Sequence, residues 1–246
     1  MAAEISSRAN PWYRRFKEAI RAHDQEIVIE GPKQIEDAIA RGWKPIAFAT
    51  DREWPGVVVR ALRFSPALLR SLTDTVHSQG LLGLFERSES SLDTLFDRAR
   101  GTLVMLDAVQ DPGNVGAIVR LSAAFDADGV ILTEGCADPF SQKALRASAG
   151  SALAIPICSA LRTEILEVAD RRHFPLFATT TQGGSIRELP GERLLLVFGS
   201  EGRGVSDEVA ERAESVSIPM SDRVESLNVA SAAAILLSRI YQRRFS

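Results

Sequence analysis

The feature of this sequence that most constrains its fold is the alternation of short apolar runs with amphipathic segments after residue 101. Apolar runs of strand length that alternate with segments of helical period are typical of a mostly parallel sheet with helices on both faces. The predicted strands are Leu103–Leu106, Val130–Leu132, Leu176–Ala178, Leu194–Phe198 and Val216–Ile218. The predicted helices are Val115–Phe125, Ser141–Ala149, Thr163–Arg172, Ser206–Arg212 and Leu227–Arg244. Because ligands bind beyond the carboxyl ends of such strands, we expect functional side chains directly after them.

The first 95 residues predict a second, smaller α/β domain in front of this sheet. Short strands are expected at Glu26–Ile29, Pro45–Ala49, Gly56–Val59 and Gly80–Phe85, with helices between them. The polar segment Ser88–Asp93 is the predicted joint. We therefore expect two domains, residues 1–95 and residues 96–246.

Several classes of protein are excluded by length and composition. A chain of 246 residues with 45% hydrophobic and 25% charged residues is an ordinary globular sequence. It has no apolar run long enough to span a membrane, and Met1–Arg15 lacks the apolar core of a signal peptide. Cys136 and Cys158 have neither metal-ligand spacing nor the number needed for a disulfide framework. We expect a cytoplasmic protein without a metal.

The charge balance argues against a protein that coats nucleic acid without specificity, because the formal net charge is −3. One short segment is nevertheless basic. It holds Arg14, Arg15, Lys17 and Arg21 against the single acid Glu18. An asparagine followed by proline at residues 10 and 11 predicts a helix start here, which places these side chains on exposed helix faces. The segment is either a solvated face or a contact with nucleic acid.

Polar residues follow the first predicted strand of the larger domain. Asp111 to Asn114 has the composition of a turn, and Asn114 is placed to cap the next helix. Arg120 lies six residues further on, so helical period alone does not bring the two onto one face. Local physics leaves two readings open. Either Asn114 is a helix cap and Arg120 a surface residue, or both residues take part in a functional site.

Two further segments follow strands. Residues 199–204 contain three glycines in the order G-x-x-G-x-G, which matches neither a Walker loop nor a dinucleotide fingerprint. Glu201 within this loop disfavours a pyrophosphate ligand, because two anions repel each other. The third segment runs from Ile218 to Ser226-Leu227-Asn228, where a helix rich in small residues begins and leaves backbone N–H groups unpaired.

Taken together, these segments resemble the SpoU/TrmH family of RNA ribose 2′-O-methyltransferases. The matching segments are Asn114–Arg120, Val197–Gly202 and Ile218–Ala230, in the order and at the distances that the family shows. Residues 143–150 resemble the family's segment between its first and second motifs. The resemblance spans residues 101–244. A shorter match to the family's substrate-binding domain lies at Ile29–Pro32 and Gln79–Leu82.

The resemblance implies a C-terminal deep trefoil knot, a homodimer and S-adenosylmethionine as the cofactor. It assigns the cofactor contacts to Thr179, Gly199, Gly202, Ile218, Met220 and Leu227. It assigns the catalytic positions around the reacting ribose to Asn114, Arg120, Glu201, Ser226 and Asn228. In this reading Arg120 is the general base or a clamp for a substrate phosphate, and Arg14, Arg15, Lys17 and Arg21 contact RNA.

The substrate that this resemblance implies is RNA, because only RNA carries a 2′-hydroxyl. Ribosomal RNA is the preferred substrate and transfer RNA the second. Two alternatives remain: a non-catalytic homologue that binds RNA or cofactor, and a knotted methyltransferase that acts on a base nitrogen.

Overall fold

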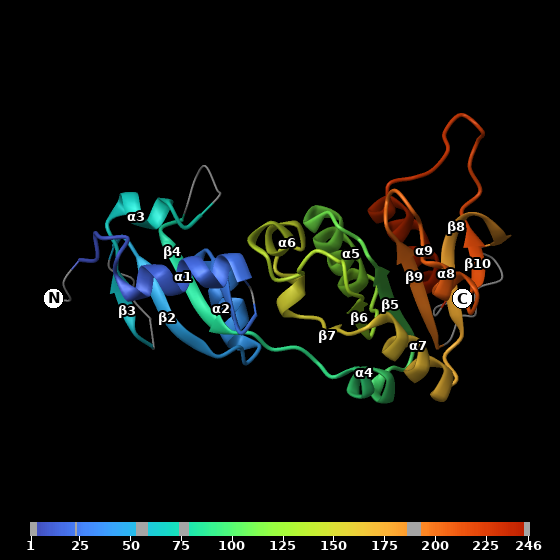
Figure 1. The fold of residues 1–246 in the computed structure, drawn as a ribbon, viewed down its shortest axis with the longest axis horizontal. Helices are drawn as coiled ribbons and strands as arrows, with labels where there is room; N and C mark the ends of the chain where they lie inside the picture. Colours follow the sequence, from blue (N-terminus) through green and yellow to red (C-terminus); the bar gives the residue numbers. More distant parts are fainter. Residues whose placement is uncertain (1–3, 23, 53–58, 74–78, 186–192, 244–246) are drawn as a thin grey trace. The chain divides into compact units, whose positions relative to one another are not determined.

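The computed structural model describes residues 4–22, 24–52, 59–73, 79–185 and 193–243. The chain forms two compact units (Figure 1). Residues 1–88 together with 140–145 make the first unit, and residues 89–139 together with 146–246 make the second. The first unit is therefore discontinuous in sequence, since a short segment from the second half of the chain belongs to it.

A four-stranded mixed sheet with the strand order β1-β4-β2-β3 forms the first unit. Its strands are β1 (Glu26–Glu30), β2 (Pro45–Thr50), β3 (Ala61–Arg63) and β4 (Leu81–Glu86). Its helices are α1 (Pro11–Ala22), α2 (Pro32–Ala40) and α3 (Pro66–Arg70). β4 is antiparallel to β1 and to β2, while β3 is parallel to β2.

Consecutive residues of β1, β2 and β4 are buried, so both faces of this sheet are covered. Tyr13 and Phe16 of α1 pack with Leu68 of α3 and Val28 of β1 on one face. Helix α1 begins as its sequence predicts, because the Asn10 side chain accepts a hydrogen bond of 2.9 Å from the Trp12 N–H. The apolar face of α1 is thereby fixed against the sheet, and its basic residues are left outward.

The segment 140–145 includes the start of α6 (Gln142–Ala147) and packs within the first unit. The Phe140 ring lies edge-on to Trp43 with 5.5 Å between centroids, and the Arg87 guanidinium lies 4.9 Å from the Phe140 centroid. The buried Gln142 side chain donates a 3.2 Å hydrogen bond to the Leu72 carbonyl. These contacts explain why the segment belongs to this unit.

The second unit is a six-stranded sheet with the order β10-β8-β9-β5-β6-β7, and its neighbouring strands run parallel. The strands are β5 (Thr102–Asp107), β6 (Gly129–Leu132), β7 (Ile157–Ser159), β8 (Leu176–Ser185), β9 (Leu194–Gly199) and β10 (Glu214–Ser217). The helices are α4 (Leu92–Arg98), α5 (Pro112–Ala124), α7 (Arg162–Arg171), α8 (Asp207–Ala210) and α9 (Val229–Arg243), with a 3₁₀ turn at Ser151–Leu153.

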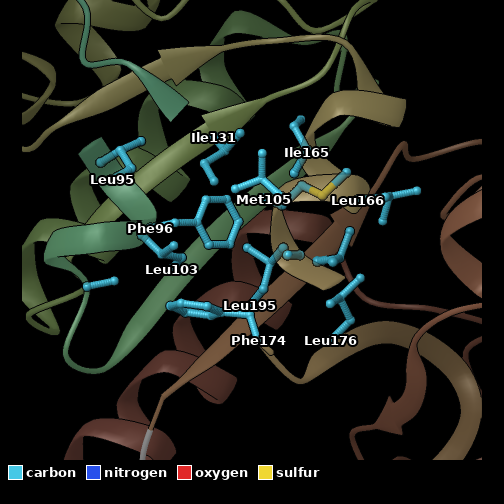
Figure 2. Packing of buried hydrophobic residues seen from close by; sticks show 14 of the residues in the cluster. Leu95, Phe96, Leu103, Met105, Ile131, Ile165, Leu166, Phe174, Leu176 and Leu195 are labelled. Atoms are coloured by element: carbon cyan, nitrogen blue, oxygen red, sulfur yellow. The ribbon is translucent and has the colours of Figure 1, made fainter. Parts of the chain in front are cut away.

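The central strands of this sheet are buried throughout, which explains the apolar runs Leu103–Leu106 and Leu194–Phe198 within them. One face packs Leu103 and Met105 of β5 and Leu195 of β9 against Phe96 of α4 and Ile165 of α7 (Figure 2). On the other side α5 and α9 pack together. The predicted α/β class and the mostly parallel sheet with helices on both faces are confirmed, while the trefoil knot stays a prediction.

Several predicted elements differ from those observed. The predicted strand at 56–59 falls outside the described residues at 56–58, and the next strand is β3. The predicted polar joint at Ser88–Asp93 runs into α4, because Ser91 caps this helix by accepting a hydrogen bond from the Thr94 N–H. The short strand β7 was not predicted, and β8 extends well beyond Ala178. No helix among the described residues is long and apolar enough to cross a membrane.

Candidate active site

A cavity of about 630 Å³ lies at the carboxyl end of β9 and beside the middle of β8. Four segments line it: β8, the loop after β9, the loop after β10 and the first turns of α9. The predicted cofactor residues Thr179, Gly199, Gly202, Ile218, Met220 and Leu227 all line it, and so do Glu201, Ser226 and Asn228. All residues that line the cavity are numbered 179 or higher, so the cavity belongs entirely to the second unit.

The loop after β9 is tightly closed by backbone contacts. Ser200 and Gly204 exchange two backbone hydrogen bonds of 2.9 Å each. Gly204 has a φ of 70°, a left-handed conformation that favours glycine. A Cβ atom at Gly199 would lie 2.0 Å from the Gly204 carbonyl carbon, so the chain can make this turn only with glycine at 199. Gly199 therefore serves close packing of the backbone beside the cavity, and Gly204 supplies the left-handed turn.

The start of α9 is held by Asn228. Its Oδ1 atom accepts hydrogen bonds from the Ala230 N–H (2.9 Å) and the Ser231 N–H (3.3 Å), the arrangement of a helix cap. The capping uses the oxygen of the side chain, so the amide nitrogen remains available. That nitrogen points to a second asparagine.

Three predicted catalytic side chains form one hydrogen-bonded row. The Asn228 Nδ2 donates to the Asn114 Oδ1 at 3.2 Å, and the Asn114 Nδ2 donates to the Glu201 Oε1 at 2.5 Å. The row joins α5, the loop after β9 and the start of α9, whose residues are 87 and 114 positions apart in sequence. The structure thus brings Asn114, Glu201 and Asn228 together.

The prediction that Asn114 caps the helix after it is wrong. Helix α5 begins earlier, at Pro112, and Asp111 caps it by accepting a 3.0 Å hydrogen bond from the Asn114 N–H. Proline at the first helical position explains the earlier start. The Asn114 side chain lies in the first turn and is free of the capping role, so it can contact Glu201 and Asn228.

Arg120 lies apart from this row. It is exposed on α5, is not among the residues that line the cavity, and makes no ion pair or hydrogen bond within the described chain. Six positions along a helix correspond to about 9 Å of rise and one and two-thirds turns, which explains its separation from Asn114. Its guanidinium is therefore available to a molecule outside this chain.

The predicted RNA contacts lie on α1 in the first unit, and they are of two kinds. Arg14, Lys17 and Arg21 are exposed, and none has an ion-pair partner among the described residues. Arg15 instead pairs with Glu26, and its guanidinium lies 5.2 Å from the centroid of the Trp12 ring. The hydrogen bond to Glu26 raises the pKa of Arg15.

Neither cysteine has the environment of a nucleophile. Burial raises the pKa of the Cys158 thiol to about 11, and the carboxylates of Glu89 and Glu164 add to the shift. Burial also raises the pKa of Cys136, whose thiol donates to the Leu106 carbonyl. Within the described ranges, histidine, cysteine, aspartate and glutamate side chains form no group of three that could hold a metal.

Several residues that line the cavity were missed in the sequence. They are Thr180, Thr181, Ser200, Arg203, Gly204, Val205, Val216, Val229, Ala232 and Leu236. The two threonines continue β8 beyond its predicted end, so a longer strand would have revealed them. Ala232 and Leu236 follow Asn228 at steps of four along α9, the spacing of one helix face.

Comparison with known proteins agrees with this geometry. The family model described as SpoU rRNA Methylase family matches residues 101–238. A 23S rRNA (adenosine(1067)-2′-O)-methyltransferase from Streptomyces laurentii is 38% identical, over 78% of this chain and 72% of its own. The 23S rRNA (guanosine(2553)-2′-O)-methyltransferase RlmP from Bacillus subtilis is 29% identical, over 94% and 95%.

Among solved structures, an AdoMet-bound rRNA methyltransferase from Sinorhizobium meliloti superposes with a TM-score of 0.90 at 29% identity, covering 99% of both chains. The family model covers more than half of this chain, and it contains each of the three post-strand segments that form the cavity and the polar row. The resemblance read from those segments is confirmed, and the chain belongs to the SpoU rRNA methylase family.

Proposed function

We propose that this protein transfers a methyl group from S-adenosylmethionine to a ribose 2′-hydroxyl of RNA, with ribosomal RNA as the substrate. The observation that carries the proposal is the row Glu201–Asn114–Asn228 at the cavity that Gly199, Ile218 and Leu227 line. Relatives named as 23S rRNA 2′-O-methyltransferases support both the position of transfer and the class of RNA.

The cavity fits the cofactor in size and chemistry. Its volume of about 630 Å³ lies within the range typical of small-molecule sites, roughly 300–1,000 Å³. Ile218, Met220 and Leu227 offer apolar contacts, and Leu227 keeps 36% of its surface exposed. Thr179 offers a hydroxyl, and the closed loop at Gly199 and Gly202 brings backbone atoms to the cavity. These six residues would hold S-adenosylmethionine.

The polar row would hold the sugar beside the cofactor. When bound, S-adenosylmethionine supplies a methyl group activated by a sulfonium centre, so this chain must align the attacking oxygen and remove its proton. Glu201 accepts from Asn114, which in turn accepts from Asn228, so the three side chains fix one another's orientation. Ser226, which lines the cavity two residues before Asn228, would add a hydroxyl to the sugar contacts.

Arg120 would act on the substrate from its exposed position on α5. Two roles fit this position: removing the proton from the 2′-hydroxyl, or holding an adjacent phosphate that orients the hydroxyl. The planar guanidinium suits a phosphate, and its high pKa works against the loss of its own proton. Both roles require an arginine that no other side chain of the protein holds, and Arg120 has no such partner among the residues that the structure describes.

The exposed face of α1, in the first unit, would contact the RNA backbone. Arg14, Lys17 and Arg21 are spaced at three and four residues, so they lie along one side of the helix. A local basic face of this kind reconciles RNA binding with a net charge of −3. The S. meliloti and Streptomyces relatives carry names that refer to ribosomal RNA, which favours this substrate.

A homodimer completes the proposal, as the family resemblance implies. Ile235 of α9 is 43% exposed, an unusual position for a large apolar side chain in a helix of this unit. Sedimentation velocity measures the mass directly. A single species of about twice 26.8 kDa is expected, and a species of monomer mass over the whole accessible concentration range would contradict this part of the proposal.

The test of the proposed reaction is methyl transfer from labelled S-adenosylmethionine to RNA from cells that lack the corresponding gene. Ribosomal and transfer RNA are assayed separately. Label in ribosomal RNA, in dinucleotides that resist alkaline cleavage, is the expected result, because a 2′-O-methyl group blocks that cleavage. Label in alkali-sensitive nucleotides would instead indicate a base nitrogen. Cofactor binding without label in either fraction would indicate a non-catalytic homologue.

A further inference from the structure

A buried carboxylate at the end of β5 contacts the segment that follows the cavity-lining loop Gly199–Val205. Asp107, the last residue of β5, is 1% exposed. Its Oδ2 atom accepts a 2.7 Å hydrogen bond from the Ser206 N–H, and its Oδ1 atom accepts a 2.8 Å hydrogen bond from the Arg162 Nε. The Thr133 hydroxyl lies 3.4 Å from the same Oδ1. One carboxylate thus joins β5, α7 and the segment after β9.

Arg162 holds this carboxylate in place. Its side chain is 17% exposed, and its Nη1 also contacts Glu134 at 3.4 Å and Glu208 at 3.2 Å. Burial works to lower the pKa of Arg162, but the hydrogen bond and charge of Asp107, together with both glutamates, outweigh burial and raise it. Because Glu134 and Glu208 remain beside it, Arg162 keeps acidic partners even without Asp107.

The hydrogen bond from the Ser206 N–H to Asp107 lies at the far end of the loop after β9, where no strand holds the chain. Gly199 ends β9 and is fixed by its strand, and the pair Ser200–Gly204 closes the turn. Beyond Gly204 the chain passes Val205, which lines the cavity, and reaches Ser206. The Ser206 hydroxyl is buried and has no hydrogen-bond partner among the described residues, so the backbone N–H makes the polar contact of this residue with Asp107.

We propose that Asp107 is a positioning residue for cofactor binding: by holding the Ser206 N–H, it fixes the loop Gly199–Val205 in the conformation that receives S-adenosylmethionine. This inference rests on the proposed function. Asp107 does not line the cavity and acts through the loop alone. A hydrogen bond to a charged group in a buried setting is strong enough to decide such a conformation.

The structure offers a matched control at the opposite end of the same strand. Asp128 also accepts main-chain hydrogen bonds, from the Gly101 N–H at 2.6 Å and the Arg100 N–H at 3.1 Å, just before β5 begins. Asp107→Ala and Asp128→Ala each remove a carboxylate that holds backbone N–H groups of unit two. They differ in which end of β5 they release.

Two measurements test the proposal, one of them without cofactor. Calorimetric titration with S-adenosylmethionine gives the dissociation constant, and hydrogen exchange of the cofactor-free protein gives the protection of the loop amides. Asp107→Ala is expected to raise the dissociation constant about tenfold or more, since the lost hydrogen bond involves a charged acceptor. Faster exchange is expected at residues 200–206, with β9 amides unchanged. Asp128→Ala is expected to leave the dissociation constant within about twofold, because it releases the far end of β5.

Asp107→Asn serves as the conservative variant and keeps the volume of the side chain if the alanine variant does not fold. Its amide oxygen can still accept from Ser206, so its dissociation constant is expected to lie between those of the unmodified protein and Asp107→Ala.

Equal cofactor affinity in the unmodified protein and both Asp107 variants would overturn the inference and leave the proposed function standing. Exchange that accelerates over the whole sheet, with no change confined to the loop, would also overturn it. Failure of the unmodified protein to bind S-adenosylmethionine would overturn the proposed function and this inference together.

Discussion

Single side chains determine what the polar end of the cavity can do. Asn114 uses both ends of its amide, accepting from Asn228 and donating to Glu201. A residue with only donors or only acceptors could not join these two partners. The row therefore has a defined direction, and each member depends on the others for its orientation.

The first prediction at the scale of single residues concerns Arg120. Arg120→Ala is expected to lower kcat for methyl transfer by about 10²–10⁴-fold, because it removes either a proton acceptor or a phosphate clamp. The affinity for S-adenosylmethionine should stay the same, since Arg120 does not line the cavity. Single-turnover assays with saturating RNA measure the effect.

Arg100→Ala is the control for Arg120, because this arginine is exposed just before β5, at the other end of the sheet from the cavity. Arg120→Lys keeps the charge and loses the planar fork, so it separates the two roles in part. Turnover near that of the unmodified protein in Arg120→Ala would show that neither role is correct.

The two cysteines carry the second prediction. Because burial raises the pKa of Cys158 to about 11 and raises that of Cys136, both thiols stay protonated at pH 8 in the folded protein. Thiolate is the reactive form, so iodoacetamide should label neither residue at pH 8 without denaturant and both in guanidinium chloride. Mass spectrometry after a timed quench measures labelling, and rapid native labelling of Cys158 would be inconsistent with its burial.

At the scale of elements, α9 both packs against the sheet and presents a site residue from its first turn. Asn228 is the cap and the last member of the polar row at once. The stability of the helix and the geometry of the site are coupled through this side chain. Two substitutions separate the contributions.

Asn228→Ala removes both contacts, so it should lower the free energy of unfolding by about 0.5–2 kcal/mol, as loss of a helix cap does. Asn228→Asp keeps the capping oxygen and loses the N–H donated to Asn114, so its stability should stay within about 0.5 kcal/mol of the unmodified protein. Methyl transfer should fall at least about tenfold in both. Urea denaturation and turnover are measured side by side. Full activity of Asn228→Asp would mean that the contact with Asn114 is dispensable.

Elements were predictable where local sequence decides them. Asn10 and Pro11 start α1 as expected, and the fully buried strands β5 and β9 lie where their apolar runs indicate. Helix α5 was placed three residues late because Pro112 can open a helix as readily as a turn. The juxtaposition of Asn114, Glu201 and Asn228 depends on tertiary contacts across more than 80 residues, so only the family resemblance indicated it.

The contact between Asp107 and Arg162 illustrates what sequence reasoning missed. Asp107 directly follows the predicted strand Leu103–Leu106, which is the position where functional polar residues are expected, but nothing local indicates its partner 55 residues away. A carboxylate at the end of a fully buried strand is a usable signal, since such a charge requires a partner.

At the scale of the whole molecule, the basic face of α1 carries the fourth prediction. Substituting Arg14, Lys17 and Arg21 together by alanine should weaken RNA binding and reduce the slope of log affinity against log salt by about 2, the change for three lost phosphate contacts. Arg15→Ala should change the slope less, because Glu26 already holds that guanidinium. Filter binding at several salt concentrations measures the slopes. An unchanged slope in the triple variant would place the RNA elsewhere.

The discontinuity of the first unit bears on how this protein can be dissected. A fragment that ends at residue 88 lacks Phe140 and Gln142, so it exposes the Trp43 ring and leaves the Leu72 carbonyl without the Gln142 amide. Such a fragment would present a new apolar surface and tend to aggregate. Isolating the first unit, which we propose contacts RNA through α1, therefore calls for grafting residues 140–145 back onto it through a short glycine linker, and for judging any loss of RNA affinity only in that repaired fragment.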